Sequence, residues 1–179
     1  MLEILHLSDL PATSWKNGGG VTREVVRRED GGRLIWRISV ANVDEHGPFS
    51  QFARLTRILT VIEGGGIDLI SSEGVRRADW GQPLWFSGNL PVQGRLCKGP
   101  IRDLNLIYDS TLVQADVQLM IGPQNISAAL GLTGCLVLTG CARVDGTALQ
   151  PDFFAFGSAG QIELDPDSKV LLVTINDLK

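Results

Sequence analysis

The sequence is poor in the residues from which metal centres and disulfide frameworks are built. It has two histidines, His6 and His46, and three cysteines among 179 residues. Two separated imidazoles cannot supply the clustered histidines of most metal sites. His46 precedes a Gly-Pro pair in a loop-like segment, where we expect exposure to solvent rather than catalysis. The three cysteines do not pair evenly, so we expect reduced and mostly buried thiols, as in a cytoplasmic protein.

The sequence also lacks an excess of basic residues and long apolar runs. Sixteen lysines and arginines stand against twenty acidic residues, which gives a formal net charge of −4 and argues against nucleic-acid binding. No stretch approaches the ~18 apolar residues of a membrane-spanning helix. The first ten residues are interrupted by Glu3, His6 and Asp9 and do not form a signal-peptide pattern. We therefore predict a cytoplasmic protein that binds neither nucleic acid nor membrane.

Helical periodicity is scarce, and the dominant repeat of apolar residues is two. Leu34, Trp36, Ile38 and Val40 alternate with other residues, which is typical of a strand with one strongly apolar face. Similar segments lie at 55–62, 67–70, 83–86, 103–108, 112–121, 135–139, 142–144, 147–149, 153–156 and 170–175. This pattern predicts an all-β barrel or sandwich, and a split near residue 111 predicts two small barrels packed together.

Three local signals predict turns. Glycines 64–66 separate two of these strands and predict a hairpin, because glycine reaches the positive φ of tight turns. Asp145-Gly146 predicts a two-residue hairpin turn. Residues 126–130, followed by Gly131, predict one or two helical turns.

Residues 15–24 contain three successive glycines. Such a run lets backbone N–H groups approach an anion closely. The segment lacks the Gly-Lys-Ser/Thr of a phosphate-binding loop, and no helical pattern follows it as in a dinucleotide fingerprint. Two interpretations remain, a ligand-binding segment or a glycine turn that leads into a strand. In the first, the side chains would come from Lys16, Asn17, Thr22, Arg23 and Glu24.

Two arginines and one carboxyl group lie in apolar strand patterns. Arg37 shares the less apolar strand face with Ser39, and Arg57 begins an apolar strand. Burying arginine is costly unless it is paired or binds an anion, although either could reach solvent at a strand end. Asp103 and Asn105 share one strand face. Asp103 could act as an acid or base, or form a structural ion pair with one of the arginines.

Four segments together resemble the signature of the HutD/Ves family. They are Trp15 to Glu24, Trp36-Arg-Ile-Ser-Val-Ala41, Gly47-Pro-Phe-Ser50 and Asp103-Leu-Asn105. The resemblance implies a cupin-type double-stranded β-helix fold in a bicupin arrangement. A first barrel over residues 1–111 would carry the motifs, and a smaller one over 112–179 would pack on it as one compact unit. Many cupins bind a metal through a His-x-His pair, which this sequence lacks, so we expect no metal and no cofactor.

The resemblance also implies a function. The family is associated with histidine utilisation, and its members are thought to bind a small acidic metabolite such as urocanate or N-formylglutamate and to regulate the pathway. No catalytic activity is firmly assigned to it. The residues that match its motifs are the predicted ligand-binding residues: Lys16, Asn17, Gly18, Gly19, Gly20, Thr22, Arg23, Glu24, Arg37, Ser39, Ser50, Arg57, Asp103 and Asn105.

Two other functions remain open at this point. A metal-independent cupin enzyme acting on a small organic acid would use Glu24 or Asp103 as base, with an arginine to stabilise the developing anion. An interaction protein would use the second barrel as a homodimer interface.

One departure from the family pattern lies at residues 52–57, where Phe-Ala-Arg stands in place of the usual Phe-Pro-Gly and changes a loop.

Overall fold

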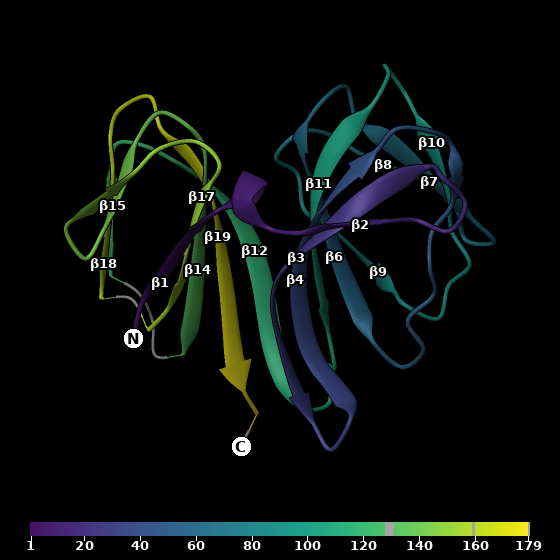
Figure 1. Cartoon of the computed structure of the whole chain (residues 1–179), viewed down its shortest axis with the longest axis horizontal. Coiled ribbons are helices and arrows are strands. Elements are labelled where there is room, and N and C mark those ends of the chain that lie inside the picture. Colours follow the sequence, from purple (N-terminus) through teal and green to yellow (C-terminus); the bar gives the residue numbers. More distant parts are fainter. Residues whose placement is uncertain (128–130, 159, 179) are drawn as a thin grey trace. The chain divides into compact units, whose positions relative to one another are not determined.

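The structure is a computed structural model that describes residues 1–127, 131–158 and 160–178. The chain divides into two compact units, one of residues 10–110 and one of residues 1–9 with 111–179 (Figure 1). In the described part of the chain, the regular elements are all β-strands apart from one short 3-10 turn, η1 (Leu7–Asp9), so the predicted all-β class is confirmed. Among the described residues, no helix is long and apolar enough to span a membrane.

The unit of residues 10–110 contains two antiparallel sheets. The six-stranded sheet has the order β2-β3-β4-β11-β6-β9, and the four-stranded sheet has the order β5-β10-β7-β8. The strands are β2 (Ala12–Ser14), β3 (Gly20–Asp30), β4 (Arg33–Val43), β5 (Gly47–Pro48), β6 (Thr56–Glu63), β7 (Ile67–Ser71), β8 (Gly74–Ala78), β9 (Leu84–Ser87), β10 (Gln93–Leu96) and β11 (Ile101–Tyr108). An apolar core joins the two sheets, with Leu59 and Val61 from one and Ile67 and Leu69 from the other.

The second unit also has two antiparallel sheets. Their orders are β1-β17-β14-β19-β12 and β13-β18-β15-β16. The strands are β1 (Glu3–His6), β12 (Val113–Ile121), β13 (Gln124–Ser127), β14 (Leu132–Thr139), β15 (Ala142–Val144), β16 (Thr147–Leu149), β17 (Phe153–Gly157), β18 (Gln161–Leu164) and β19 (Lys169–Asp177). Its core consists of apolar side chains such as Val137, Leu149 and Ile162.

The structure differs from the sequence-based expectations at three places. The predicted first barrel began at residue 1, but β1 pairs with β17 and therefore lies in the unit that contains residues 111–179. Glycines 64–66 do not close a hairpin, because β6 and β7 belong to different sheets. Of the predicted helical turn at 126–130, residues 126 and 127 end strand β13, and residues 128–130 lie outside the described part of the chain. The Asp145-Gly146 turn between β15 and β16 is confirmed.

Gly20 allows β3 to approach β4 closely. A Cβ atom at this position would lie 2.2 Å from the backbone oxygen of Asn42, closer than any real contact. We therefore expect Gly20→Ala to lower the free energy of unfolding in urea by about 1–3 kcal/mol. The matched control is Gly19→Ala, whose Cβ would meet only the Asn17 side chain at an ordinary 3.5 Å, with an expected change of about 0.5 kcal/mol or less. Equal stability of the two variants would contradict this explanation.

Candidate functional site

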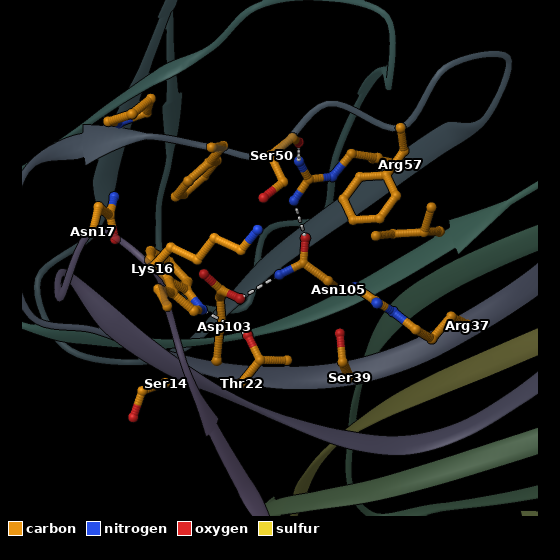
Figure 2. Close-up of a pocket in the computed structure, with 16 residues that line it drawn as sticks. Ser14, Lys16, Asn17, Thr22, Arg37, Ser39, Ser50, Arg57, Asp103 and Asn105 are labelled. Carbon is orange, nitrogen blue, oxygen red and sulfur yellow. Dashed lines mark hydrogen bonds between the residues drawn. The ribbon is translucent and has the colours of Figure 1, made fainter.

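The unit of residues 10–110 contains a cavity of about 520 Å³ on the inner face of its six-stranded sheet (Figure 2). Polar and charged side chains from five strands and two connecting segments line it. Nine of the residues predicted from the sequence lie on its wall: Lys16, Asn17, Thr22, Arg37, Ser39, Ser50, Arg57, Asp103 and Asn105. A volume of this size is typical of a site for a small molecule.

The cavity arises because the inner face of the sheet changes from apolar to polar along its strands. In β4, Ala41 and Val43 belong to the core, whereas Ser39 and Arg37, on the same face, line the cavity. Every second residue of a strand points to the same face. The alternation that builds the core therefore also directs these polar side chains inward.

Strand register brings two arginines to opposite sides of β11. Arg37 of β4 and Arg57 of β6 both lie opposite Ile107 of β11. Asp103 and Asn105 lie on the same face of β11 as Ile107, so the three central strands together form one polar surface. The sequence predicted that Arg37 shares a strand face with Ser39 and that Asp103 shares one with Asn105. The strand register brings these two pairs together.

Arg57 is a buried cation fixed by neutral acceptors. Its side chain is 6% exposed. Nη1 donates to the backbone oxygen of Ser50 at 3.0 Å, and Nη2 donates to Oδ1 of Asn105 at 2.8 Å. Three aromatic rings surround the guanidinium at 4.9–5.6 Å, namely Phe49, Phe52 and Phe86. Burial lowers the pKa of Arg57 to about 10, with Asp103 opposing and Arg37 reinforcing that shift, so the group stays charged at neutral pH.

Asp103 is a buried carboxyl group with few hydrogen bonds. It is 1% exposed, and its Oδ1 accepts a hydrogen bond from Nδ2 of Asn105. Among the described residues, Oδ2 has no hydrogen-bond partner. Burial raises the pKa of Asp103 to about 7, although the nearby Arg57 charge and the Asn105 bond both act to lower it. The carboxyl group is therefore partly neutral near pH 7.

Arg37 and Lys16 are the two cavity cations whose side chains form no hydrogen bond with any described residue. The guanidinium of Arg37 lies 5.1 Å from the ring centre of Phe52, and its buried Nε has no partner within the described ranges. Burial lowers the pKa of Arg37, and the charge of Glu24 opposes that effect. Lys16 is exposed at the mouth, and its side chain extends over the cavity (Figure 2). Neither side chain has an ion pair with any described residue.

The glycine-rich segment forms a turn that carries Lys16 and Asn17 to the cavity. The N–H of Gly18 donates to the oxygen of Trp15, and the N–H of Gly19 donates to Oδ1 of Asn17 at 3.1 Å. These amides are already bonded within the turn, so they do not form the anion-binding cradle considered from the sequence. None of the three glycines lines the cavity.

Arg23 and Glu24 also lie off the cavity wall. Arg23 alternates with Thr22 along β3, and its Nη1 donates to Oδ1 of Asn42 at 3.1 Å. Glu24 is exposed and lies 3.5 Å from Nε of Arg27. Of the two carboxylates considered as bases, only Asp103 therefore reaches the cavity.

Sequence reasoning missed the apolar part of the wall, which includes Trp15, Phe49 and Phe52. Trp15 donates from Nε1 to Oγ1 of Thr22 at 2.8 Å and packs edge-on against Phe49. These aromatic residues precede Lys16 or flank Ser50 in the sequence. Their position in the sequence, within two residues of Lys16 or Ser50, was the signal that could have found them.

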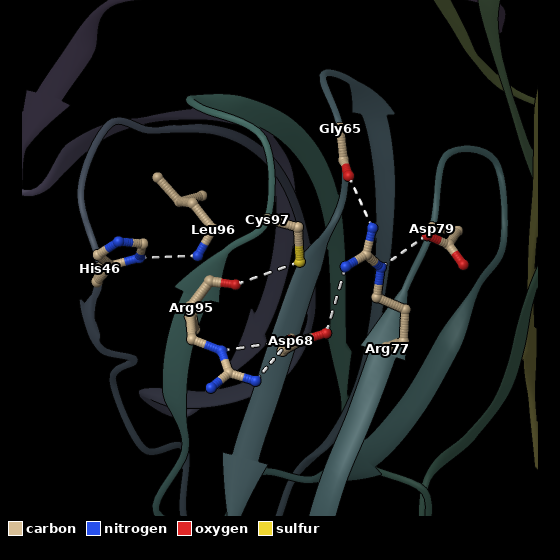
Figure 3. Close-up of polar contacts among 8 residues, drawn as sticks. All are labelled: His46, Gly65, Asp68, Arg77, Asp79, Arg95, Leu96 and Cys97. Atoms are coloured by element: carbon tan, nitrogen blue, oxygen red, sulfur yellow. Dashed lines mark hydrogen bonds and ion pairs between the residues drawn. The ribbon is translucent and has the colours of Figure 1, made fainter.

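Outside the cavity, a polar cluster covers the four-stranded sheet of the same unit (Figure 3). Asp68 bridges two arginines, with Arg95 Nη2 at 2.9 Å and Arg77 Nη1 at 3.5 Å. The exposed His46 accepts the N–H of Leu96 through Nδ1 at 2.9 Å, which gives this ring a structural role. Exposed ion pairs of this kind contribute little to stability.

Across the described residues, no three His, Cys, Asp or Glu side chains are placed to hold a metal.

Comparisons with known proteins agree with the resemblance in the sequence. The family model described as HutD matches residues 7–172. A Pseudomonas putida protein described as an uncharacterised 21.2 kDa protein in the hutC 3' region is 37% identical over an alignment of 138 residues, and the match covers 70% of this chain and 67% of the relative. Protein Ves of Cronobacter sakazakii is 28% identical over 120 residues, 66% of each chain. The chain thus spans about two thirds of the length of these curated relatives.

Solved structures extend the likeness to the fold. HutD from Pseudomonas fluorescens, described as a formate-condition structure, superposes with a TM-score of 0.89 at 30% identity and covers both chains completely. A cupin 2 conserved barrel domain protein from Leptotrichia buccalis has a TM-score of 0.62 at 11% identity, covering 97% of this chain and 96% of that one. The second likeness concerns the fold alone and establishes a cupin-type β fold.

Proposed function

The chain belongs to the HutD family, and on that premise we propose that its cavity binds a small carboxylate metabolite without converting it. The protein would act as a regulatory protein of the histidine-utilisation type, with urocanate or N-formylglutamate as candidate ligands. Binding would regulate a partner or a conformation only if the ligand's affinity differs between the two states.

The observation that carries this proposal is the surplus of cations around the cavity. The charged residues on its described wall are Lys16, Arg37, Arg57 and Asp103. Asp103 is partly neutral near pH 7, so the wall has a net positive charge that an anion would compensate. The planar fork of arginine meets a carboxylate with two parallel hydrogen bonds. Ser39, Asn17 and Asn105 could fix the orientation of the rest of the ligand.

A thermal-shift screen tests this proposal. The panel is histidine, urocanate, formiminoglutamate, N-formylglutamate and glutamate. A ligand present at ~100 times its dissociation constant should add about 2.7 kcal/mol of stability, which corresponds to several degrees for a chain of this size. The proposal requires a hit that NMR shows to be unchanged after hours with the protein. Absence of any shift across the panel would contradict it.

Lys16 allows a smaller test at the mouth of the cavity. We expect Lys16→Ala to weaken binding of the best hit about three- to fivefold, because an exposed charge contributes about 1 kcal/mol at most. The loss should diminish at high salt, since exposed charges are screened. Lys98→Ala removes an equal charge from an exposed site outside the cavity and serves as the control. Equal affinities of the two variants would remove Lys16 from the site.

One observation favours a second candidate function, a metal-independent enzyme that acts on a small acid. Asp103 has a pKa of about 7 and an oxygen without a partner among the described residues, which suits a general acid or base. The discriminating result is steady consumption of the stabilising ligand that is lost in Asp103→Asn. Stable ligand over the same period would favour the binding protein.

A further inference from the structure

The hydrogen bonds of Asp103 suit a neutral carboxylic acid better than a carboxylate. A carboxylate can accept about four hydrogen bonds, yet from the described residues this one accepts a single bond, from Asn105 to Oδ1. Its Oδ2 is buried and has no partner within the described chain, although Asp103 is part of the cavity wall. Figure 2 shows Oδ2 on the side of the carboxyl group away from Asn105. A protonated Oδ2 would be a donor ready for a ligand in the cavity.

Arg57 does not neutralise Asp103 directly. Asn105 lies between the two groups, because its amide donates to Asp103 and its oxygen accepts from Arg57. The remaining partner of Arg57 is the backbone oxygen of Ser50, which carries no charge. The positive charge of Arg57 is therefore held by neutral acceptors, and a ligand anion is a suitable counter-ion for it.

The other charged groups around Asp103 come from three elements. Arg57 lies on β6, Arg37 on β4, and Lys16 on the segment that precedes β3, all on the cavity wall. Glu24 of β3 is exposed, lies off the cavity wall and raises the pKa of Arg37. None of these groups adds a second negative charge to the wall. An ionised Asp103 would therefore be the main source of repulsion for an anionic ligand.

From this arrangement we propose that Asp103 binds the ligand as a neutral acid, with Oδ2–H donating a hydrogen bond to the ligand's carboxylate. The step takes one proton from solvent whenever the unliganded Asp103 was ionised, and no covalent bond to the ligand changes. Asp103 is thus a specificity-determining residue that favours anions able to accept this bond. The inference rests on the proposed function of the cavity as a carboxylate site.

Proton uptake gives the binding a definite pH dependence. A bound anion favours the neutral form of Asp103, so the pKa of this group rises above its unliganded value of about 7. Below about pH 7 the acid is already protonated and affinity should be constant. Between the unliganded and the liganded pKa, the dissociation constant should rise by up to about tenfold per pH unit.

Formate alone is a suitable probe, because it stays ionised across the pH range of interest. In protein labelled with ¹³C at the aspartate carboxyl groups, the Asp103 resonance is titrated with pH, without formate and at saturating formate. We expect formate to raise the titration midpoint by about one pH unit or more. The dissociation constant of formate should follow the pH dependence above. In Asp103→Asn it should be independent of pH and close to the low-pH value of the unmodified protein, because the amide N–H replaces the acid O–H.

Asp79→Asn, at an exposed aspartate paired with Arg77, is the matched control and should retain the pH dependence. A midpoint that stays or falls with formate, or an affinity that increases with pH, overturns the role of Asp103 and leaves the carboxylate site intact. If formate perturbs no resonance of the cavity below pH 7, carboxylate binding and the role of Asp103 fail together. The titration of the unmodified protein decides the question even if Asp103→Asn does not fold.

Discussion

Replacing Arg57 by alanine should lower the free energy of unfolding by about 3–5 kcal/mol and abolish ligand binding. The side chain is 6% exposed and donates to Ser50 and Asn105. Alanine would leave the buried Asn105 oxygen without its donor and open a void among three phenylalanine rings. Both effects are large in cores, and a desolvated cation–ring contact contributes about 2 kcal/mol more.

Arg57→Met separates the contribution of Arg57 to folding from its contribution to binding. Methionine fills the space among the rings, so the void of the alanine variant does not form, and the remaining cost is the Asn105 oxygen left without its donor. We expect urea unfolding of Arg57→Met to stay within about 1–2 kcal/mol of the unmodified protein, while calorimetry detects no ligand. Arg143→Ala removes an exposed arginine from the other unit and should change stability by about 0.5 kcal/mol or less. An Arg57→Met variant that still binds the ligand would remove Arg57 from the site.

The sequence was sufficient to predict most strands and which side chains of a strand share a face. The repeat of two placed Arg37 with Ser39 and Asp103 with Asn105, and the structure directs all four to the cavity. Local sequence signals did not predict strand pairing where the partner strand lies far away in the sequence. Glycines 64–66 permit a reversal of the chain, but which strand β7 pairs with depends on packing in the four-stranded sheet. For the same reason the sequence did not show that β1 belongs to the second unit, because its partner β17 lies about 150 residues away.

The aromatic enclosure of Arg57 could not be predicted from local sequence. Phe49 and Phe52 come from the loop before β6, whereas Phe86 comes from β9. The sequence suggested an ion pair between Asp103 and an arginine, but the structure inserts the Asn105 amide between Asp103 and Arg57. A short polar side chain can bridge two groups or bond to its own turn, and only the three-dimensional arrangement distinguishes these outcomes.

Arg37 should behave in the opposite way to Arg57, with a large effect on binding and little effect on folding. No described residue forms a hydrogen bond or ion pair with its guanidinium, and its main contact is the ring of Phe52. Arg37 also lowers the pKa of Arg57, which means that the two positive charges repel each other. Arg37→Ala should therefore leave urea unfolding within about 0.5–1 kcal/mol of the unmodified protein.

The loss of binding in Arg37→Ala should be about 100-fold, because hydrogen bonds between charged partners contribute about 1.5–3 kcal/mol. Calorimetric titration with the best ligand of the screen measures it, with Arg143→Ala as the control of equal charge. Arg37→Lys retains the charge but loses the planar fork, so we expect it to recover only about tenfold of that loss. Arg37 has no hydrogen-bond or ion-pair partner among the described residues, so a large loss of binding with little loss of stability would mean that it is positioned for a ligand. Unchanged affinity in Arg37→Ala, together with a stability loss above about 1 kcal/mol, would instead assign Arg37 to the fold.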